Sequence, residues 1–521
     1  MRELRGHELG RRATVERELR LAPVLCSALL LAACSDSSDS PVGPDGGSGG
    51  GSQLPTTEEW AERVDSFFGP APSVDQRLAV FDEVWTMLSE DFAGFGALDV
   101  DWDAVRSELR PRAESASTYG RFYQVISEMV SRLPDMHTVI HSVEVCLLND
   151  PQFFVQRPPV LIQYYERSRL GICVTPDTND DLMVYSAEPG NPTGLEPGDV
   201  IVGLDGASPA EVLQLLDEWQ LPLCGSRDST PISDHFSRLT ERVHDNTHLF
   251  QTVQVRRFAT GTVESLPTEA WLQNMSLLAC RDQLPVAGVA FPWTDMPIND
   301  PNARDVSWGR AEGTNVGYIY VYGTSDAIAQ LFDDAVTALW ATHGLIIDLR
   351  FNSGGVMPID TGGSMDAGIR QLFQTEIPNM FQLAVRDSAS TDRTALTVIQ
   401  QLSLRVDPAT YYDHPIAVLT GPRAGSGGDF AVYALARHPR AQRFGLPTHG
   451  AFGSQYAFTL TSSDDILGAY ANGAALDSAG VLLKGAVQTA EHPVWLTTSD
   501  SALGTDSVVQ AALTWIAQSS P

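Results

Sequence analysis

The chain has 521 residues, of which 43% are hydrophobic and 8% aromatic, as in a globular protein long enough for two or three domains. Its 34 Lys and Arg residues stand against 65 Asp and Glu residues, which gives a formal net charge of −31 at pH 7. This charge disfavours nucleic acids and anionic lipid surfaces as partners.

The N-terminus is predicted to be a targeting segment. Several arginines precede an apolar run over 21–33, which is too short for a transmembrane helix and ends in Leu31-Ala32-Ala33-Cys34. Residues 1–34 resemble a bacterial lipoprotein signal in which Cys34 carries the lipid, so we expect a lipid-anchored protein of the cell envelope, facing the periplasm or the cell surface. A plain secretory signal is the alternative. Residues 35–55, rich in Ser, Gly, Pro and Asp, are predicted to be a flexible tether.

Residues 56–150 are predicted to form a helical region, because apolar residues recur there at helical spacing. Two such stripes occur, Leu78, Val80, Phe81, Val84, Trp85 and Leu88, then Phe122, Val125, Ile126, Met129, Val130 and Leu133. The second stripe runs into Pro134-Asp135-Met136-His137-Thr138. A lone histidine near a helix end is usually structural or solvated, so periodicity alone gives His137 no role.

The cysteines indicate disulfides rather than a metal site. Four of the six lie beyond the predicted signal, at Cys146, Cys173, Cys224 and Cys280. In an oxidising compartment they permit two disulfides, in any of three connectivities. None has the spacing of zinc ligands, and we expect no metal or other cofactor.

Residues 151–270 resemble a PDZ domain. Residues 182–186 are predicted to be a strand, and Gly194-Leu195-Glu196-Pro197-Gly198-Asp199, with Asp205-Gly206 behind it, follows the signature of that module. Such modules bind an extended C-terminal peptide as an added edge strand, so the resemblance implies a protein or peptide partner that is held by its C-terminus. Residues 271–314 show little periodicity and are predicted to be a linker.

The pattern of residues 315–521 is that of a mixed helix and strand domain. Residues 316–321 and 345–349 are predicted to be strands, with an amphipathic helix over 326–340 between them. This β-α-β order implies a right-handed crossover and a buried sheet. Polar residues and glycines follow the second strand, suggesting a backbone nest at its end: Asp348, Arg350, Asn352, Gly354 and Gly355.

A serine follows the next predicted strand, at 416–419. Ser426 lies between Gly425 and Gly427-Gly428, just before a helix predicted over 430–436. The free amides at a helix N-terminus favour the anion that forms when a nucleophile attacks a carbonyl group. The alternative is that Ser426 caps the helix and the glycines only make a turn.

Taken together, Asp348-Leu-Arg350-x-Asn352-x-Gly354-Gly355 and the later strand with Ser-Gly-Gly-Asp resemble the tail-specific (C-terminal processing) serine protease family, including its tricorn-like branch. The resemblance extends from about Gln76 to the C-terminus. It implies an α+β multidomain fold with an N-terminal helical region, a PDZ-like β domain and a crotonase/Clp-like αβ spiral protease domain. It also implies Ser426 as nucleophile and an oxyanion hole made by the N–H of Gly427 with that of Gly354 or Gly355.

The resemblance offers two ways of activating the serine. Members that use lysine carry it in Thr-x-Gly-Lys, but here the stretch is Thr448-His449-Gly450-Ala451. The only lysine of the chain, Lys484, lies in a later turn, and we expect it to be a surface residue without a role. Tricorn-like members use a histidine after the helical region, which implies His137 as general base, with His449 as a rival.

A histidine base needs an acid to orient it. Tricorn-like members supply a carboxylate three residues before a late Gly-Val, and Asp477 stands three residues before Gly480-Val481. Asp135 competes with Asp477, but it is so near His137 in sequence that contact with the ring would need a tight turn.

The prediction is therefore an exported, lipid-anchored serine endopeptidase acting on proteins or peptides. One alternative is an inactive ligand- or peptide-binding protein on the same scaffold. Another is a serine esterase of the α/β-hydrolase type, which would need a late histidine such as His492 and leaves residues 344–355 unexplained.

Overall fold

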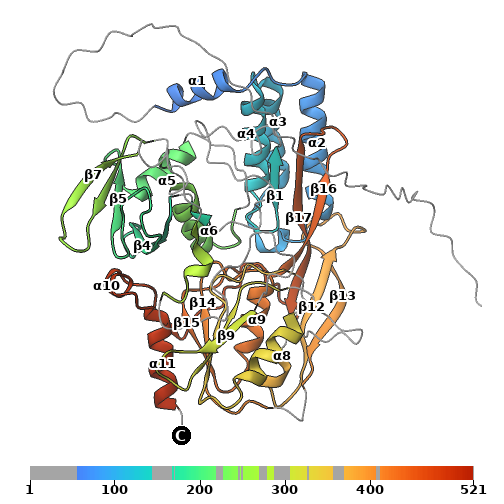
Figure 1. Cartoon of the computed structure of the whole chain (residues 1–521). Helices are drawn as coiled ribbons and strands as arrows, with labels where there is room; N and C mark the ends of the chain where they lie inside the picture. Colours follow the sequence, from blue (N-terminus) through green and yellow to red (C-terminus); the bar gives the residue numbers. More distant parts are fainter. Residues whose placement is uncertain are drawn as a thin grey trace, which may run out of the picture. The chain divides into compact units, whose positions relative to one another are not determined.

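The computed structural model describes residues 56–142, 167–168, 170–218, 227–243, 247, 250–268, 278–286, 306–324, 328–355, 369–406 and 411–519 (Figure 1). All of them belong to one compact unit, Gly51–Pro521. The predicted signal with Cys34, the predicted tether, Cys146 and Cys224 lie outside the described residues. The structure contains a disulfide bond between Cys173 and Cys280, which belongs to one of the three possible connectivities.

Within the region 56–150 that is predicted to be helical, helices extend from Thr57 to Ser131. Its elements are α1 (Thr57–Phe67), α2 (Val74–Asp91), η1 (Phe95–Ala97), α3 (Trp102–Ser115) and α4 (Tyr119–Ser131). The side chains of Asp101 and Thr118 accept hydrogen bonds from the first turns of α3 and α4, which explains where these helices begin. Both predicted stripes supply buried core residues, such as Phe81 and Ile126. No helix among the described residues is long and apolar enough to cross a membrane.

A five-stranded antiparallel sheet follows, in the order β3-β4-β5-β6-β7. Its strands are β3 (Ile172–Pro176), β4 (Leu182–Ala187), β5 (Val200–Leu204), β6 (Thr252–Arg256) and β7 (Val263–Pro267). Between β5 and β6 lie α5 (Pro209–Glu218), α6 (Pro231–Ser237) and the π-helical turn η4 (Arg238–Val243). β2 (Arg167–Ser168) pairs with β8 (Leu278–Ala279), which leads into η6 (Cys280–Gln283).

A second sheet has six strands in the order β18-β15-β14-β11-β10-β9. They are β9 (Val306–Arg310), β10 (Gly317–Val321), β11 (Leu345–Asp348), β14 (Ile416–Thr420), β15 (Ala441–Gly445) and β18 (His492–Pro493). All pairs are parallel except β9 with β10. The linker predicted over 271–314 therefore needs correction, because β9 lies within it and is hydrogen-bonded to the sheet. The sequence does not indicate this strand, because the segment before it contains several Pro, Asn and Asp residues and shows little periodicity.

Helices cover both faces of this sheet. α8 (Ile328–Ala338) and α9 (Gly427–Leu435) share a core with Ile319, Ile347 and Val418. The neighbouring residues of the same strands, Tyr318 and Ile346 among them, point the other way into a core with α11 (Ser507–Ser519). Figure 1 shows α8 and α9 on one side of these strands and α11, preceded by α10 (Thr498–Ala502), on the other. Strands that are covered on both faces are apolar throughout, so their sequences directly predict buried strands.

The third sheet joins the two ends of the chain. Its path is β1-β17-β12-β13, with β16 also paired to β17. The strands are β1 (Val139–Ser142), β12 (Ile377–Arg386), β13 (Leu396–Leu404), β16 (Gly453–Thr459) and β17 (Ile466–Asp477), and η7 (Ile369–Leu372) precedes β12. β1 follows directly after the loop that carries His137, and it pairs antiparallel with β17. The helical region is thereby tied to the C-terminal half of the chain.

Candidate active site

Ser426 stands at the sharp turn between β14 and α9. Its backbone has φ 53° and ψ −118°, a positive φ that L-residues other than glycine rarely adopt. Such a conformation costs about 1–3 kcal/mol and persists where the surrounding structure enforces it, often at functional sites. The Ser426 side chain makes no capping hydrogen bond to α9. The N-cap alternative for Ser426 is therefore not what the structure shows.

His137 reaches this serine from the other end of the chain. Its loop is fixed by β1, which pairs Val139 with Ala469 of β17, and by Thr138, whose Oγ1 accepts a hydrogen bond of 3.2 Å from the N–H of Ala471. Gln455 of β16 donates to the carbonyl of His137 at 3.3 Å. The His137 Nε2 atom lies 3.0 Å from Ser426 Oγ, and the imidazole is buried, with 7% of its residue exposed. The structure thus brings together the two residues that sequence analysis singled out.

Asp135 is the carboxylate beside the His137 ring. Its Oδ1 accepts a hydrogen bond of 2.7 Å from the His137 backbone N–H and lies 3.3 Å from His137 Nδ1. The tight turn that sequence analysis considered a difficulty is present, because the N–H of Thr138 donates to the carbonyl of Asp135 at 2.9 Å. Burial by itself would raise the pKa of Asp135, but the Lys484 ammonium and the contact with His137 outweigh it and hold this pKa well below its usual range. Asp135 is therefore ionised.

Lys484 is not the surface residue that we expected. It is 7% exposed, its Nζ pairs with Asp135 Oδ2, and it donates to the carbonyl of Pro134 at 3.0 Å. Its ammonium also lies 5.7 Å from the centre of the Phe92 ring. The position of Lys484 in a late turn suggests an exposed side chain. The turn after β17 instead folds back onto the loop of His137 and buries it.

Replacing Lys484 by methionine should strongly destabilise the protein. The substitution keeps an apolar stem but leaves Asp135 as a buried carboxylate without a cation, and breaking a buried pair typically costs about 3–5 kcal/mol. Urea unfolding at neutral pH measures this loss. Lys484→Arg, which keeps the charge, is the matched variant and should lose less. Equal stability of Lys484→Met and the wild type would mean that the buried pair is absent.

Asp477 lies elsewhere, and its predicted role as the orienting acid needs correction. Its carboxylate accepts hydrogen bonds from the N–H groups of Ala479 at 2.8 Å and Val481 at 2.9 Å, so it shapes the turn after β17. In the part of the chain that the structure describes, it makes no contact with His137. The carboxylate that does contact this ring, Asp135, comes from two residues upstream.

Glycines bring a backbone nest against Ser426. A Cβ atom on Gly354 would come within 2.5 Å of Ser426 Cβ and 2.9 Å of its Oγ, so only glycine fits there. The Gly354 N–H is already used, because it donates to Asn352 Oδ1 at 2.9 Å. Among the described residues, the N–H groups of Gly355 and Gly427 have no hydrogen-bond partner. Of the two alternatives for the second amide, the structure leaves Gly355 available and Gly354 occupied.

The other polar residues of the motif in 344–355 hold the scaffold. Asn352 accepts a hydrogen bond of 2.9 Å from Gly425 through its carbonyl, and its side chain donates to Val321 at 3.1 Å, linking the serine loop to β10. Arg350 is completely buried between Asp348 and Asp506, with its Nη2 2.9 Å from Asp506. Asp506 in turn accepts from the first turn of α11. These charges are paired and structural.

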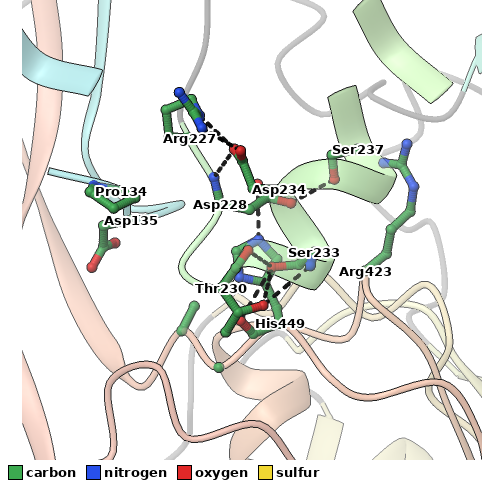
Figure 2. A network of polar contacts seen from close by, with 12 residues as sticks. Pro134, Asp135, Arg227, Asp228, Thr230, Ser233, Asp234, Ser237, Arg423 and His449 are labelled. Carbon is green, nitrogen blue, oxygen red and sulfur yellow. Dashed lines mark hydrogen bonds and ion pairs between the residues drawn. The ribbon is translucent and has the colours of Figure 1, made fainter. Parts of the chain in front are cut away.

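His449, the rival base, belongs to a separate buried network (Figure 2). Its Nε2 lies 3.0 Å from Asp228 Oδ1, and its backbone N–H donates to Ala424, two residues before Ser426. Figure 2 shows Asp228 between His449 and Ser237, whose hydroxyl donates to Asp228 at 2.6 Å. Burial by itself would lower the pKa of His449, but Asp228 and more distant carboxylates outweigh it and raise this pKa. The His449 ring therefore anchors the start of α6 to the strand and loop behind the nucleophile.

Replacing His449 by glutamine should destabilise the protein most below neutral pH, contrary to the mild effect that a loop-lining histidine would have. Because the folded pKa is raised, the stabilisation is fully present below the ordinary histidine pKa of about 6.5 and is lost as the pH rises through the folded pKa. The pKa of Asp228 is lowered, since His449 outweighs the effect of burial, so its contribution lasts until the pH falls through that value. Near pH 6 we expect a loss of about 3–5 kcal/mol.

Urea unfolding of His449→Gln at a series of pH values measures this loss. His235→Gln is the matched control, because His235 pairs with Asp180 at 2.9 Å on the surface. Such exposed pairs contribute about 0–1 kcal/mol. Equal losses in the two variants would refute the buried network.

His492, which an α/β-hydrolase mechanism would need, does not approach the serine. It lies in β18, where its ring stacks on Phe444 at 4.3 Å and its Nε2 contacts Gln442. No group of three or more His, Cys, Asp or Glu residues within the described ranges could hold a metal ion. The site therefore consists of Ser426, His137, Asp135 with Lys484, and the glycine amides.

Two segments of the chain match models of known protein families. Residues 315–485 match the model of peptidase family S41, and residues 73–131 match the tricorn protease C1 domain. No curated protein matches the chain. Among solved structures, mature CPAF is 13% identical with a TM-score of 0.57, covering 83% of this chain and 94% of that chain.

Two further structures are similar. Mature CPAF complexed with lactacystin is 13% identical with a TM-score of 0.56, covering 85% of this chain and 97% of that one. The photosystem II D1 C-terminal processing protease is 18% identical with a TM-score of 0.39, covering 81% and 94%. At these identities the likeness to CPAF shows the shared fold. The matched residues 315–485 therefore form a domain of peptidase family S41, which supports a serine-type peptidase.

Proposed function

We propose that this protein is an exported, lipid-anchored serine endopeptidase in which Ser426, His137 and Asp135 form the catalytic triad. The observation that carries the proposal is the 3.0 Å contact between His137 Nε2 and Ser426 Oγ. This distance is within the range in which a general base takes a proton from a nucleophile. The two residues are 289 positions apart. The pairing of β1 with β17 and the hydrogen bonds of Thr138 with Ala471 and of Gln455 with His137 hold the His137 loop in place.

The reaction begins when Ser426 Oγ attacks the carbonyl carbon of a peptide bond while His137 Nε2 takes the hydroxyl proton. The tetrahedral intermediate then collapses, the C–N bond breaks, and His137 gives the proton to the leaving amine. Water repeats the sequence on the acyl-enzyme and releases the second product. A histidine 3.0 Å from the serine hydroxyl is placed to take its proton and to pass it to the leaving amine.

Asp135 orients the ring and stabilises the imidazolium that forms. It accepts from the backbone N–H of His137 and faces Nδ1, so Nε2 is left to face the serine. Lys484 keeps Asp135 ionised in a buried site, which explains why the chain's only lysine is placed here. His137 is thus the base, and Lys484 contributes by stabilising the ionised form of Asp135.

The N–H groups of Gly427 and Gly355 are the donors that we assign to the oxyanion. Gly427 begins α9, so its amide lies at the positive end of the helix dipole. The strained backbone of Ser426 places its hydroxyl in front of this helix end. Gly427 thus follows the nucleophile directly in the chain, whereas Gly355 comes from the glycine nest after β11.

The antiparallel sheet β3 to β7 is the unit that we take to be PDZ-like, and the six-stranded sheet with its helices the crotonase/Clp-like unit. Residues of the PDZ signature form the turn before β5, where Asp199 accepts hydrogen bonds from Glu196 and Phe258. A unit of this kind would hold the C-terminus of a substrate. Protein and peptide substrates are therefore the class we propose.

The proposal is tested by incubating the full-length protein with an unfolded protein substrate and identifying the fragments by mass spectrometry. We expect internal cleavage that produces new N-termini. An inactive binding protein would retain the substrate intact, and an esterase would cleave activated esters but leave the peptide bonds uncut. Either outcome would contradict the proposal.

We also expect Cys34→Ser to release the protein from the membrane fraction. The substitution removes the thiol that would carry the lipid, and the remaining signal supports export only. Fractionation of cells that produce the wild type and the variant measures the effect. If the wild type is already found in the soluble fraction after export, the proposed lipid anchor does not exist.

A further inference from the structure

One buried hydroxyl near the nucleophile has no partner. Thr324 lies just after β10, with 8% of the residue exposed, and its Oγ1 forms no hydrogen bond with any described residue. Buried polar groups nearly always find a partner, and leaving one unpaired typically costs about 1–3 kcal/mol. Valine has the same shape without this cost. An unpaired hydroxyl at this position therefore needs an explanation.

The backbone fixes Thr324 against the glycine nest. Its N–H donates to the carbonyl of Gly354 at 2.9 Å, and it forms a parallel bridge with Gly355. Neither contact uses the side chain. These backbone contacts fix Thr324 beside the nest and leave its side chain free to donate.

The hydroxyl lies beside the two glycines whose amides we assign to the oxyanion. A Cβ atom on Gly427 would lie 2.5 Å from Thr324 Oγ1, and a Cβ atom on Gly355 would lie 3.0 Å from the same oxygen. Gly354, between them, is the glycine that approaches Ser426 Oγ. Within the described residues, the Thr324 hydroxyl and the amides of Gly355 and Gly427 are thus without partners and belong to residues that lie close together beside the nucleophile.

We propose that the Thr324 hydroxyl is a third donor of the oxyanion hole. This inference rests on the proposed peptidase function. When Ser426 Oγ bonds to the carbonyl carbon, the electron pair of the C=O double bond moves to oxygen, and Thr324 donates to that oxyanion together with Gly355 and Gly427. When the C–N bond breaks, the double bond forms again and His137 protonates the leaving amine. Thr324 itself keeps its proton.

The hydroxyl acts mainly in the transition state. In the free protein it has no partner, so a hydrogen bond is gained when negative charge develops beside it. A donor of this kind raises turnover and has little effect on substrate affinity. A purely structural threonine would lower stability when replaced and change turnover only through that loss.

The test compares Thr324→Val and Thr324→Ser in the full-length protein, measuring kcat, KM, melting temperature and inhibition by a peptide aldehyde. The aldehyde bonds to a catalytic serine and places an oxyanion in the hole. We expect Thr324→Val to lower kcat about 10²- to 10³-fold, the usual effect of losing one such donor, with KM nearly unchanged. Aldehyde affinity should fall as well. Thr324→Ser should keep most of the activity.

Stability separates this role from a structural one. Thr324→Val should melt at the same temperature as the wild type or higher, because it removes an unpaired hydroxyl. Thr342→Val is the matched control: Thr342 is 1% exposed, and its hydroxyl donates to Leu339 at 2.6 Å. That variant should lower the melting temperature and leave kcat unchanged.

Two results would overturn the inference. In the first, Thr324→Val has wild-type kcat and wild-type aldehyde affinity while the wild type is active, which leaves the proposed function intact. In the second, the wild type neither cleaves peptides nor binds the aldehyde, which removes the proposed function and this inference together.

Discussion

Replacing Ser426 by alanine is expected to abolish peptide hydrolysis, with a loss of about 10⁶-fold in turnover, the usual effect of removing a triad serine. The substitution deletes one hydroxyl that contacts His137 and does not cap α9. The fold should therefore persist, with a change in unfolding free energy of at most about 0.5 kcal/mol. Fragment production from an unfolded protein substrate measures the activity.

Ser426→Gly provides the control for strain. The backbone of Ser426 has φ 53°, which glycine adopts without cost. This variant should be as inactive as Ser426→Ala but more stable, by about 1 kcal/mol. Activity that survives in either variant, in protein free of contaminating proteases, would remove Ser426 from the mechanism.

Asparagine in place of Asp135 should lower turnover about 10⁴-fold, the loss known for the corresponding change in a Ser-His-Asp triad. Asparagine has nearly the same shape, but it cannot supply the negative charge that stabilises the imidazolium. It also leaves Lys484 as a buried cation without its carboxylate, so some loss of stability accompanies the loss of activity. Steady-state kinetics and urea unfolding separate the two effects.

Asp477→Asn is the matched variant for this experiment. It alters a turn whose amides hydrogen-bond to the Asp477 side chain, and it does not touch His137. We expect near-normal turnover. If Asp477→Asn were the inactive variant and Asp135→Asn the active one, the acid of the triad would have to be reassigned and the geometry beside His137 would lack a function.

Much of the fold follows from residue patterns that have one physical solution. The strands β11 and β14 are covered on both faces, so their sequences are continuous apolar runs, whereas the stripes of α2 and α4 mark one buried face each. Ser426 and the two glycines of the nest were found for a similar reason. Turns that require positive φ or close backbone approach need glycine, and Gly354 and Gly355 both have positive φ.

The residues whose roles are not predicted from the sequence depend on contacts between segments that no local pattern connects. Lys484 follows β17 in the chain, but its ammonium pairs with Asp135, 349 positions away, and no local pattern reports such a contact. The sequence leaves His449 open as a rival base, because its partner, Asp228, lies in a distant segment and no local pattern indicates their contact. Asp135 is not predicted as the acid beside His137, because their contact depends on a tight turn. No residue pattern in the loop between α4 and β1 indicates that turn.

The central claim is that His137 activates Ser426, and the most direct test is to identify the residue that a fluorophosphonate probe modifies. Such probes react with serines that a neighbouring base activates, so peptide mass spectrometry should find the label on Ser426 in the wild type. The label should be lost in His137→Ala and retained in His449→Gln at a pH where that variant is folded. Absence of label in the folded wild type, or labelling of Ser426 that is undiminished in His137→Ala, would contradict the account.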